Sequence, residues 1–87
     1  MRKITFTPEA FKEYNDLIVA DFELVQKIVL LIRAIQQDPF RGIGKPEPLK
    51  HIAPGTWSRR ITEEHRLVYL VSDDRVDFLQ GRYHYTR

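Results

Sequence analysis

Residues 41–66, RGIGKPEPLKHIAPGTWSRRITEEHR, divide the chain into two parts with different hydrophobic periodicity. Before this stretch, apolar residues recur at every third or fourth position, which is typical of amphipathic helices. From residue 56 onward they recur at every second position, which is typical of strands. The glycines and prolines of residues 40–55 predict a loop with short extended pieces. This order of elements predicts an α+β domain.

One strand and two helices are expected in the first part. Residues 2–6 alternate as in a short strand, and Thr7-Pro8-Glu9 is typical of a helix start. Threonine can cap the helix, proline loses no hydrogen bond at the first helical position, and glutamate favours the positive helix end. The first helix is expected to end near residue 20. The second helix is expected to be capped by Asp21 and to end near Asp38, before Pro39, forming an antiparallel hairpin with the first.

Three strands are expected in the second part, at residues 56–62, 66–71 and 76–85, with a turn at residues 72–74. Together with the first strand they predict a mostly antiparallel, twisted sheet. The N-terminal strand and the helical hairpin would pack on one face of this sheet, because two amphipathic helices need a sheet to cover their apolar side. The whole chain, residues 1–87, is expected to be a single domain.

Composition excludes several classes of site. The chain has no cysteine, which removes disulfides, zinc–thiolate sites and thiol nucleophiles and fits a reducing cytosol. No apolar run is long enough for a signal peptide or a membrane span, so we expect a cytoplasmic protein. Asp73, Asp74 and Asp77 fit a hairpin turn and its flank better than a metal site, because nothing nearby completes a coordination shell.

Positive charge is concentrated in the second part of the chain. Residues 1–38 have a net charge of −1 and residues 39–87 a net charge of +3. Between residues 41 and 60, a single carboxylate, Glu47, stands between two prolines and among five cationic residues: Arg41, Lys45, Lys50, Arg59 and Arg60. The prolines restrict Glu47 to extended backbone conformations, which helps to hold its carboxylate in place. This part of the chain is therefore expected to bind a polyanion.

Glu47, His84 and the arginines form a set that could cleave RNA without a metal. A base removes the proton of a ribose 2′-hydroxyl, whose oxygen then attacks the neighbouring phosphate. An acid protonates the departing 5′-oxygen, and cations stabilise the charge that builds on the phosphoryl group. Glutamate is an available base at neutral pH, and histidine can supply a proton.

From the sequence alone, the same residues could instead have structural roles. Glu47 could simply offset repulsion among its cationic neighbours, and His84 could be a packed residue of an edge strand. Arg59 and Arg60 project to opposite faces of their strand, so at least one of them is expected to face solvent or a surface partner. Trp57 is expected in the core.

Long segments of the second part strongly resemble the YoeB toxins, the Txe/YoeB branch of the RelE/ParE superfamily of bacterial toxins. The matching segments are Pro39-Phe40, residues 44–51 (GKPEPLKH), residues 57–69 (WSRRITEEHRLVY) and residues 82–85 (RYHY). They keep the family's order and approximate spacing, as do the two preceding helices. Residues 76–81 do not match closely, and Thr86-Arg87 extend past the point at which such chains end.

The resemblance implies a RelE-like microbial RNase fold and a type II toxin that enters the ribosomal A site and cuts mRNA there. It assigns Glu47 as the general base and His84 as the general acid. Arg66 would stabilise the phosphate in the transition state, and Tyr85 would stack on the nucleotide or orient it. The residues that would hold RNA are Lys45, Lys50, Arg59 and Arg60. No metal or other cofactor is implied.

Partners are also implied by the resemblance. They are the ribosome, mRNA and a cognate YefM-like antitoxin whose C-terminal segment folds onto the toxin, in a homodimer or a two-toxin complex. Three alternatives remain. One is a gyrase poison like the ParE toxins, which share the fold but lack the Glu/His/Tyr set. The second is an RNA-binding module that does not cut, and the third is a domain that binds an acidic protein tail.

Overall fold

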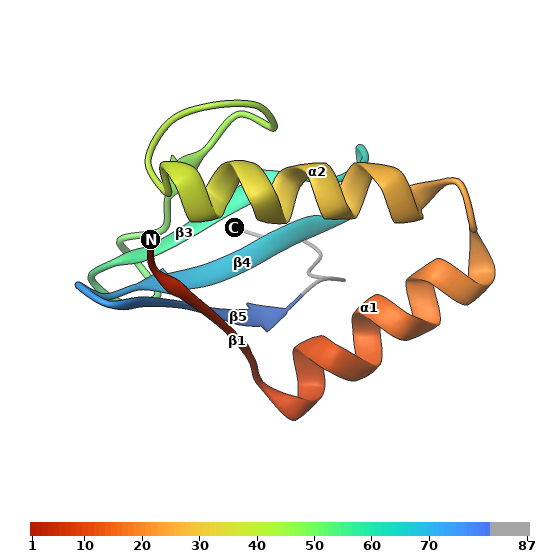
Figure 1. The fold of residues 1–87 in the computed structure, drawn as a ribbon, viewed down its shortest axis with the longest axis horizontal. Helices are drawn as coiled ribbons and strands as arrows, with labels where there is room; N and C mark the ends of the chain where they lie inside the picture. Colours follow the sequence, from red (N-terminus) through yellow and green to blue (C-terminus); the bar gives the residue numbers. More distant parts are fainter. Residues whose placement is uncertain (81–87) are drawn as a thin grey trace.

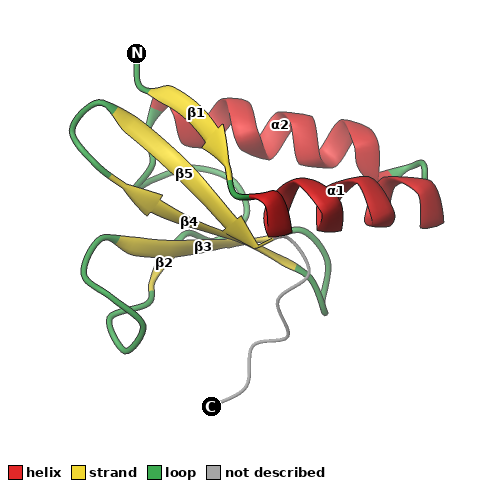
Figure 2. Cartoon of the chain, turned by 90° about the horizontal axis from the view of Figure 1, so that it is seen from below, coloured by secondary structure: helices red, strands yellow, loops and turns green. Residues whose placement is uncertain are grey.

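Five strands and two helices make up the described part of the chain, residues 1–80 of the computed structural model. The elements are β1 (Lys3–Phe6), α1 (Pro8–Ala20), α2 (Leu24–Gln37), β2 (Glu47–Pro48), β3 (Thr56–Arg60), β4 (Arg66–Val71) and β5 (Arg75–Gln80). The strands form one sheet in the order β1-β5-β4-β3-β2, in which only the β1–β5 pair is parallel. Both helices lie on the same side of the sheet (Figure 2). The predicted α+β fold is confirmed.

The helix boundaries follow from local chemistry. Thr7 is extended and its hydroxyl accepts a hydrogen bond from the backbone N–H of Ala10 at 3.0 Å, so it caps α1 as predicted. α2 begins at Leu24, later than expected, because the Asp21 carboxylate accepts from the N–H of Glu23 and forms a turn there. α1 runs toward this turn, and α2 returns from it over β3 and β4 (Figure 1).

The core fills the space between the helices and the sheet. α1 contributes Ala10, Tyr14 and Leu17, α2 contributes Ile28, Leu31 and Ile35, and the sheet side contributes Ile61, Leu67, Tyr69, Val76 and Phe78. Burial of each large apolar side chain stabilises the fold by about 1.5–3 kcal/mol. Trp57, which was expected in the core, is half-buried at its edge, where its ring centroid lies 5.3 Å from that of Phe40. Among residues 1–80, neither helix is long and apolar enough to cross a bilayer.

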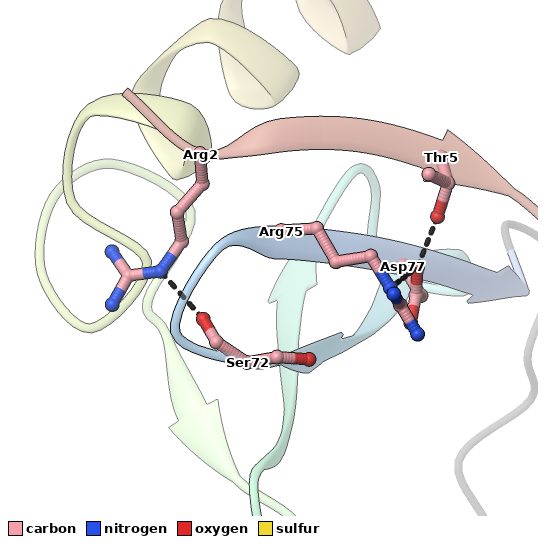
Figure 3. Close-up of polar contacts among 5 residues, drawn as sticks. All are labelled: Arg2, Thr5, Ser72, Arg75 and Asp77. Carbon is pink, nitrogen blue, oxygen red and sulfur yellow. Dashed lines mark hydrogen bonds and ion pairs between the residues drawn. The ribbon is translucent and has the colours of Figure 1, made fainter.

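A polar network joins the first strand to the last hairpin (Figure 3). The Thr5 hydroxyl donates to the Asp77 carboxylate directly across the parallel β1–β5 pair. Arg75 donates to the same carboxylate at 3.0 Å, and the Nε of Arg2 donates to the carbonyl of Ser72 at 2.8 Å. The hydrogen bond from Thr5, and after it the Arg75 guanidinium, hold the pKa of Asp77 below its usual range.

Arg59 is the largest fully buried side chain in the described part of the chain. Its nitrogens donate to one tyrosine hydroxyl and three backbone carbonyls: Tyr69 Oη (3.1 Å), Ile43 O (3.1 Å), Asp38 O (2.6 Å) and Arg41 O (2.8 Å). Tyr69 in turn donates to the carbonyl of Pro39 at 2.7 Å. Burial raises the pKa of Tyr69 more than Arg59 lowers it, so this hydroxyl keeps its proton. Arg59 and Tyr69 together therefore hold the segment 38–43, called here the 38–43 loop.

The prediction that Arg59 contacts RNA is corrected by this burial. Arg59 and Arg60 do project to opposite faces of β3, as expected from strand alternation. Arg59 shares the helix-covered face with Trp57, and its guanidinium donors are taken up by groups of the protein itself. Its role is to fasten a loop to the sheet.

Replacing Arg59 by lysine is expected to lower the free energy of unfolding by about 2–4 kcal/mol. Lysine lacks the planar fork that reaches several acceptors at once, so buried carbonyls would lose their donors. Urea denaturation measures the change. The matched control is Arg33→Lys, at an exposed position of α2, which is expected to change stability by less than about 0.5 kcal/mol. Equal stability of the two variants would contradict the role of Arg59.

Asp77→Asn is expected to make the free energy of unfolding less dependent on pH in the acidic range. Because the pKa of Asp77 is lower in the folded chain than in the unfolded one, its contribution is complete above the unfolded value of about 3.9 and is lost as pH falls through the folded value. The variant should therefore be less stable than wild type near neutral pH, and the difference should shrink below about pH 4. Urea denaturation across this range tests it, with Asp73→Asn in the exposed turn as the control. A difference that stays constant with pH would refute the linkage.

Candidate functional site

The sheet face opposite the helices, called here the site face, gathers residues from three strands. Glu47 of β2 is the cross-strand partner of Ser58 on β3, and Arg60 of β3 is the partner of Arg66 on β4. Directly opposed residues project to the same face, as do residues two apart on one strand. Because Arg59 faces the helices, these four residues project from the other face. The strand register thus brings one carboxylate and two guanidinium groups to one surface.

Glu47 is exposed and lies on a very short edge strand. Its neighbours Pro46 and Pro48 lack N–H donors, which suits them to an edge that pairs on one side only. The next residue, Leu49, is fully buried and donates its N–H to the carbonyl of Thr56 at 2.8 Å. The Glu47 carboxylate is therefore exposed, while the backbone that carries it is fixed at Leu49.

Gly44 fixes the other side of this segment. Its φ is +84°, and a Cβ atom there would lie 2.7 Å from a methyl carbon of Leu31. Its carbonyl accepts from the N–H of Arg60 at 2.7 Å, which fastens the segment to β3. Lys45 follows with φ +50°, a left-handed conformation that is uncommon outside glycine. As a result Lys45 and Arg60 line the same hollow, whose volume is about 370 Å³.

Arg60 and Arg66 are half-buried and directly opposed across β3 and β4. An anion placed between two guanidinium groups in this position would be attracted by both. The Nε of Arg60 is buried and has no hydrogen-bond partner within residues 1–80. This pair is the part of the site face best suited to hold a phosphate.

Lys50 lies apart from the arginine pair. It is exposed and lines a second hollow, of about 460 Å³, together with residues near the start of β3, including Thr56 and Trp57. Arg60, in contrast, is at the end of that strand. Of the cations predicted to hold RNA, the structure therefore groups Lys45 with Arg60 and places Lys50 toward the opposite end of β3.

Two predicted site residues, His84 and Tyr85, lie outside the described residues. The strand predicted at residues 76–85 is described from Arg75 to Gln80. Within it, Tyr69 pairs with Phe78 while Val68 pairs with Gln80, so β5 carries one extra residue at this point. The expected convergence of Glu47 and His84 on one phosphate stays a prediction.

Ser58 is a site-face residue to which the sequence analysis assigned no role. It is fully buried, and its hydroxyl has no hydrogen-bond partner in the part of the chain that the structure describes. A serine between a tryptophan and an arginine gives no signal of its own in the sequence. Only the strand register places it directly opposite Glu47.

The acidic residues of the described part of the chain do not form a metal site. Among residues 1–80, no group of three His, Asp or Glu side chains is arranged to hold a metal ion. Asp73 and Asp74 lie in the turn between β4 and β5, as their spacing predicted.

Comparisons with known proteins identify the family to which this chain belongs. A model of the YoeB-like toxins of bacterial type II toxin–antitoxin systems matches residues 6–85. Toxin YoeB of Mycobacterium bovis is 51% identical over 85 residues, which cover 98% of this chain and 100% of the relative. The YoeB dimer from Staphylococcus aureus superimposes with a TM-score of 0.88 at 44% identity, over 97% of this chain and 98% of that one. The S. aureus YoeB–YefM complex gives 0.83 at 42% identity, over 98% and 99%. The chain belongs to the YoeB-like toxins of bacterial type II toxin–antitoxin systems.

Proposed function

We propose that this toxin is a ribosome-dependent mRNA interferase. It would cut mRNA in the ribosomal A site by acid–base catalysis without a catalytic metal, and so inhibit translation. The observation that carries the proposal is the register that sets Glu47, Arg60 and Arg66 on one face of the sheet. An exposed carboxylate beside a pair of opposed guanidinium groups is suited to deprotonate a hydroxyl next to a bound phosphate.

The proposed reaction is attack of a ribose 2′-hydroxyl on the adjacent phosphorus. Glu47 takes the 2′ proton while the 2′-oxygen forms its bond to phosphorus, and Arg66 with Arg60 stabilises the charge that builds on the phosphoryl oxygens. The bond from phosphorus to the 5′-oxygen breaks, and His84 donates the proton that this oxygen needs. The products are a 2′,3′-cyclic phosphate and a free 5′-hydroxyl. Tyr85 would orient the nucleotide by stacking.

Binding of RNA would rest on phosphate contacts more than on base contacts. Lys45 and Arg60 line one hollow and Lys50 another, so the cations are spread along β3 and suit an extended backbone. Phosphate contacts position a nucleic acid but carry no sequence information directly. The ribosome would therefore supply most of the orientation of the substrate, which is the costly part of bringing reacting groups together.

Partners of the relatives support the assembly that we propose. S. aureus YoeB is described as a dimer and in complex with YefM, in one case as a heterotetramer. We infer that this chain likewise binds a YefM-type antitoxin and forms a dimer or a two-toxin complex in the cytoplasm, where ribosomes and mRNA are available.

Glu47→Gln and His84→Ala are each expected to reduce mRNA cleavage by a factor of about 10²–10⁴. Both changes remove a proton-transfer group and leave the cationic residues in place, so ribosome binding should be largely kept. The assay uses purified protein, programmed ribosomes and a defined mRNA, with metal concentration varied over the range in which ribosomes stay intact. Product ends are examined for cyclic phosphate.

Glu9→Gln, at an exposed carboxylate in the first turn of α1, is the matched control and should cut like wild type. Equal cleavage by all the proteins would reject the acid–base assignment. No cleavage by wild type, together with tight ribosome binding, would favour an RNA-binding module that does not cut.

Expression of the wild-type chain is expected to arrest growth and protein synthesis in a bacterial host, and co-expression of the YefM-type antitoxin of the same genome should restore both. The Glu47→Gln chain should leave growth normal without antitoxin, because cleavage causes the arrest. Incorporation of labelled amino acids measures translation. Arrest by Glu47→Gln equal to that of wild type would show that toxicity does not depend on this carboxylate.

A further inference from the structure

Ser58 carries a buried hydroxyl group to which residues 1–80 offer no hydrogen bond. Its side chain is fully buried, and its Oγ has no partner within this part of the chain. Such an atom has lost its water without compensation, and native structures rarely keep one without a reason. Ser58 projects to the site face, because its neighbour Arg59 faces the helices. Its hydroxyl is therefore a candidate for a role in the site.

The strand register determines which side chains surround this hydroxyl. Glu47 is directly opposite Ser58 on one side and Val68 is directly opposite it on the other. Thr56 and Arg60 are two residues away on β3 and project to the same face. Valine has no acceptor, arginine has donors only, and threonine offers a neutral hydroxyl. Among these four neighbours, Glu47 alone has an ionised acceptor, which accepts hydrogen bonds about twice as strong as a neutral one does.

The side chains of Glu47 and Ser58 can meet without movement of the backbone. Directly opposed residues of an antiparallel pair have their Cβ atoms about 4.5–5.5 Å apart. The Oγ of serine is bonded to its own Cβ, and the carboxylate of glutamate is two carbons beyond its Cβ. Rotation of the exposed Glu47 side chain can therefore bring the oxygens to the distance of about 2.5–2.7 Å that is usual for a hydroxyl bonded to a carboxylate.

We propose that Ser58 is a positioning residue whose hydroxyl donates to the Glu47 carboxylate when RNA covers the site face. The inference rests on the proposed function, because it concerns the base of that reaction. One oxygen of the carboxylate would accept from Ser58, and the other would face the ribose 2′-hydroxyl. A base must lie within about 2.6–3.2 Å of the oxygen whose proton it takes, and a second contact on the carboxylate helps a flexible side chain to keep that distance.

Loss of water gives the reason for the bond to form in the RNA complex. Glu47 is exposed in the free chain, so water can solvate its carboxylate. RNA that covers the site face removes this water, and a carboxylate without donors is strongly unfavourable in such surroundings. Phosphoryl oxygens would occupy Arg60 and Arg66, so the hydroxyl opposite Glu47 supplies the donor. Ser58 keeps its own proton throughout and takes no part in the bond changes.

Two other roles for Ser58 give different expectations. If its small size only permits close packing, alanine should replace it without loss of cleavage, because removal of an unpaired buried hydroxyl is neutral or stabilising. If its hydroxyl binds RNA directly, alanine should weaken binding to the programmed ribosome. The burial of Oγ argues against this second role, since RNA could not reach the atom without displacing the groups that cover it.

The test compares single-turnover cleavage of a defined mRNA on programmed ribosomes by wild type, Ser58→Ala, Glu47→Gln and the variant with both changes. Ser72→Ala is the matched control, because it removes a serine hydroxyl between β4 and β5, outside the site face. Ribosome affinity and urea denaturation are measured for every protein. These two measurements separate a loss of positioning from a loss of binding or of folding.

Ser58→Ala is expected to slow cleavage by a factor of about 10–100, which is the effect of a lost hydrogen bond to a charged group. Its ribosome affinity should stay within about twofold of wild type, and its stability should equal or exceed that of wild type. Ser72→Ala should cut like wild type. In the Glu47→Gln background, the change of Ser58 to alanine should cost less than about twofold, because no base remains to be positioned.

Cleavage by Ser58→Ala at the wild-type rate would overturn the inference, and so would an equal loss of rate in the Glu47→Gln background. A loss of ribosome affinity as large as the loss of cleavage would assign the hydroxyl to RNA binding instead. If Glu47→Gln abolishes cleavage and Ser58→Ala does not slow it, the nuclease proposal stands and only the role of Ser58 is rejected. If wild type itself does not cut, both proposals fail.

Discussion

The buried guanidinium of Arg59 is the interaction on which the rest of the site depends. A fully buried charge is tolerated only when hydrogen bonds replace its water, and here three backbone carbonyls and a tyrosine hydroxyl do so. The carbonyls belong to the 38–43 loop, which has little regular structure of its own. Arg59 therefore ties this irregular segment, which lies between the end of α2 and the start of β2, to β3.

From this anchor the chain reaches the site in a few residues. The carbonyl of Gly44 bonds to the backbone of Arg60, Lys45 adopts a left-handed turn, and Glu47 then pairs across from Ser58. Neighbouring arginines thus have opposite tasks. Arg59 holds the loop from the helix-covered face, while Arg60 projects to the opposite face by strand alternation, across from Arg66. β3 thereby positions both the 38–43 loop and the residues of the site face.

The cations proposed to bind RNA reach beyond the strands that carry them. Arg60 and Lys45 line a hollow together with Lys27, Leu30 and Leu31, which belong to α2. The covering helix and the strand register therefore both shape the surroundings of the proposed catalytic site.

Local pattern in the sequence determined the elements of this protein: the Thr7 cap, the two helices, the strand periods and the turn at residues 72–74 all depend on neighbours a few residues apart. The resemblance of residues 44–51 and 57–69 to a toxin family also lay in the sequence. Alternation showed that Arg59 and Arg60 face opposite ways, and the shared parity of Arg59 with Trp57 was a signal for the core face. The tertiary structure alone decided that Arg59 is buried and that Ser58 opposes Glu47, because each depends on partners distant in the chain.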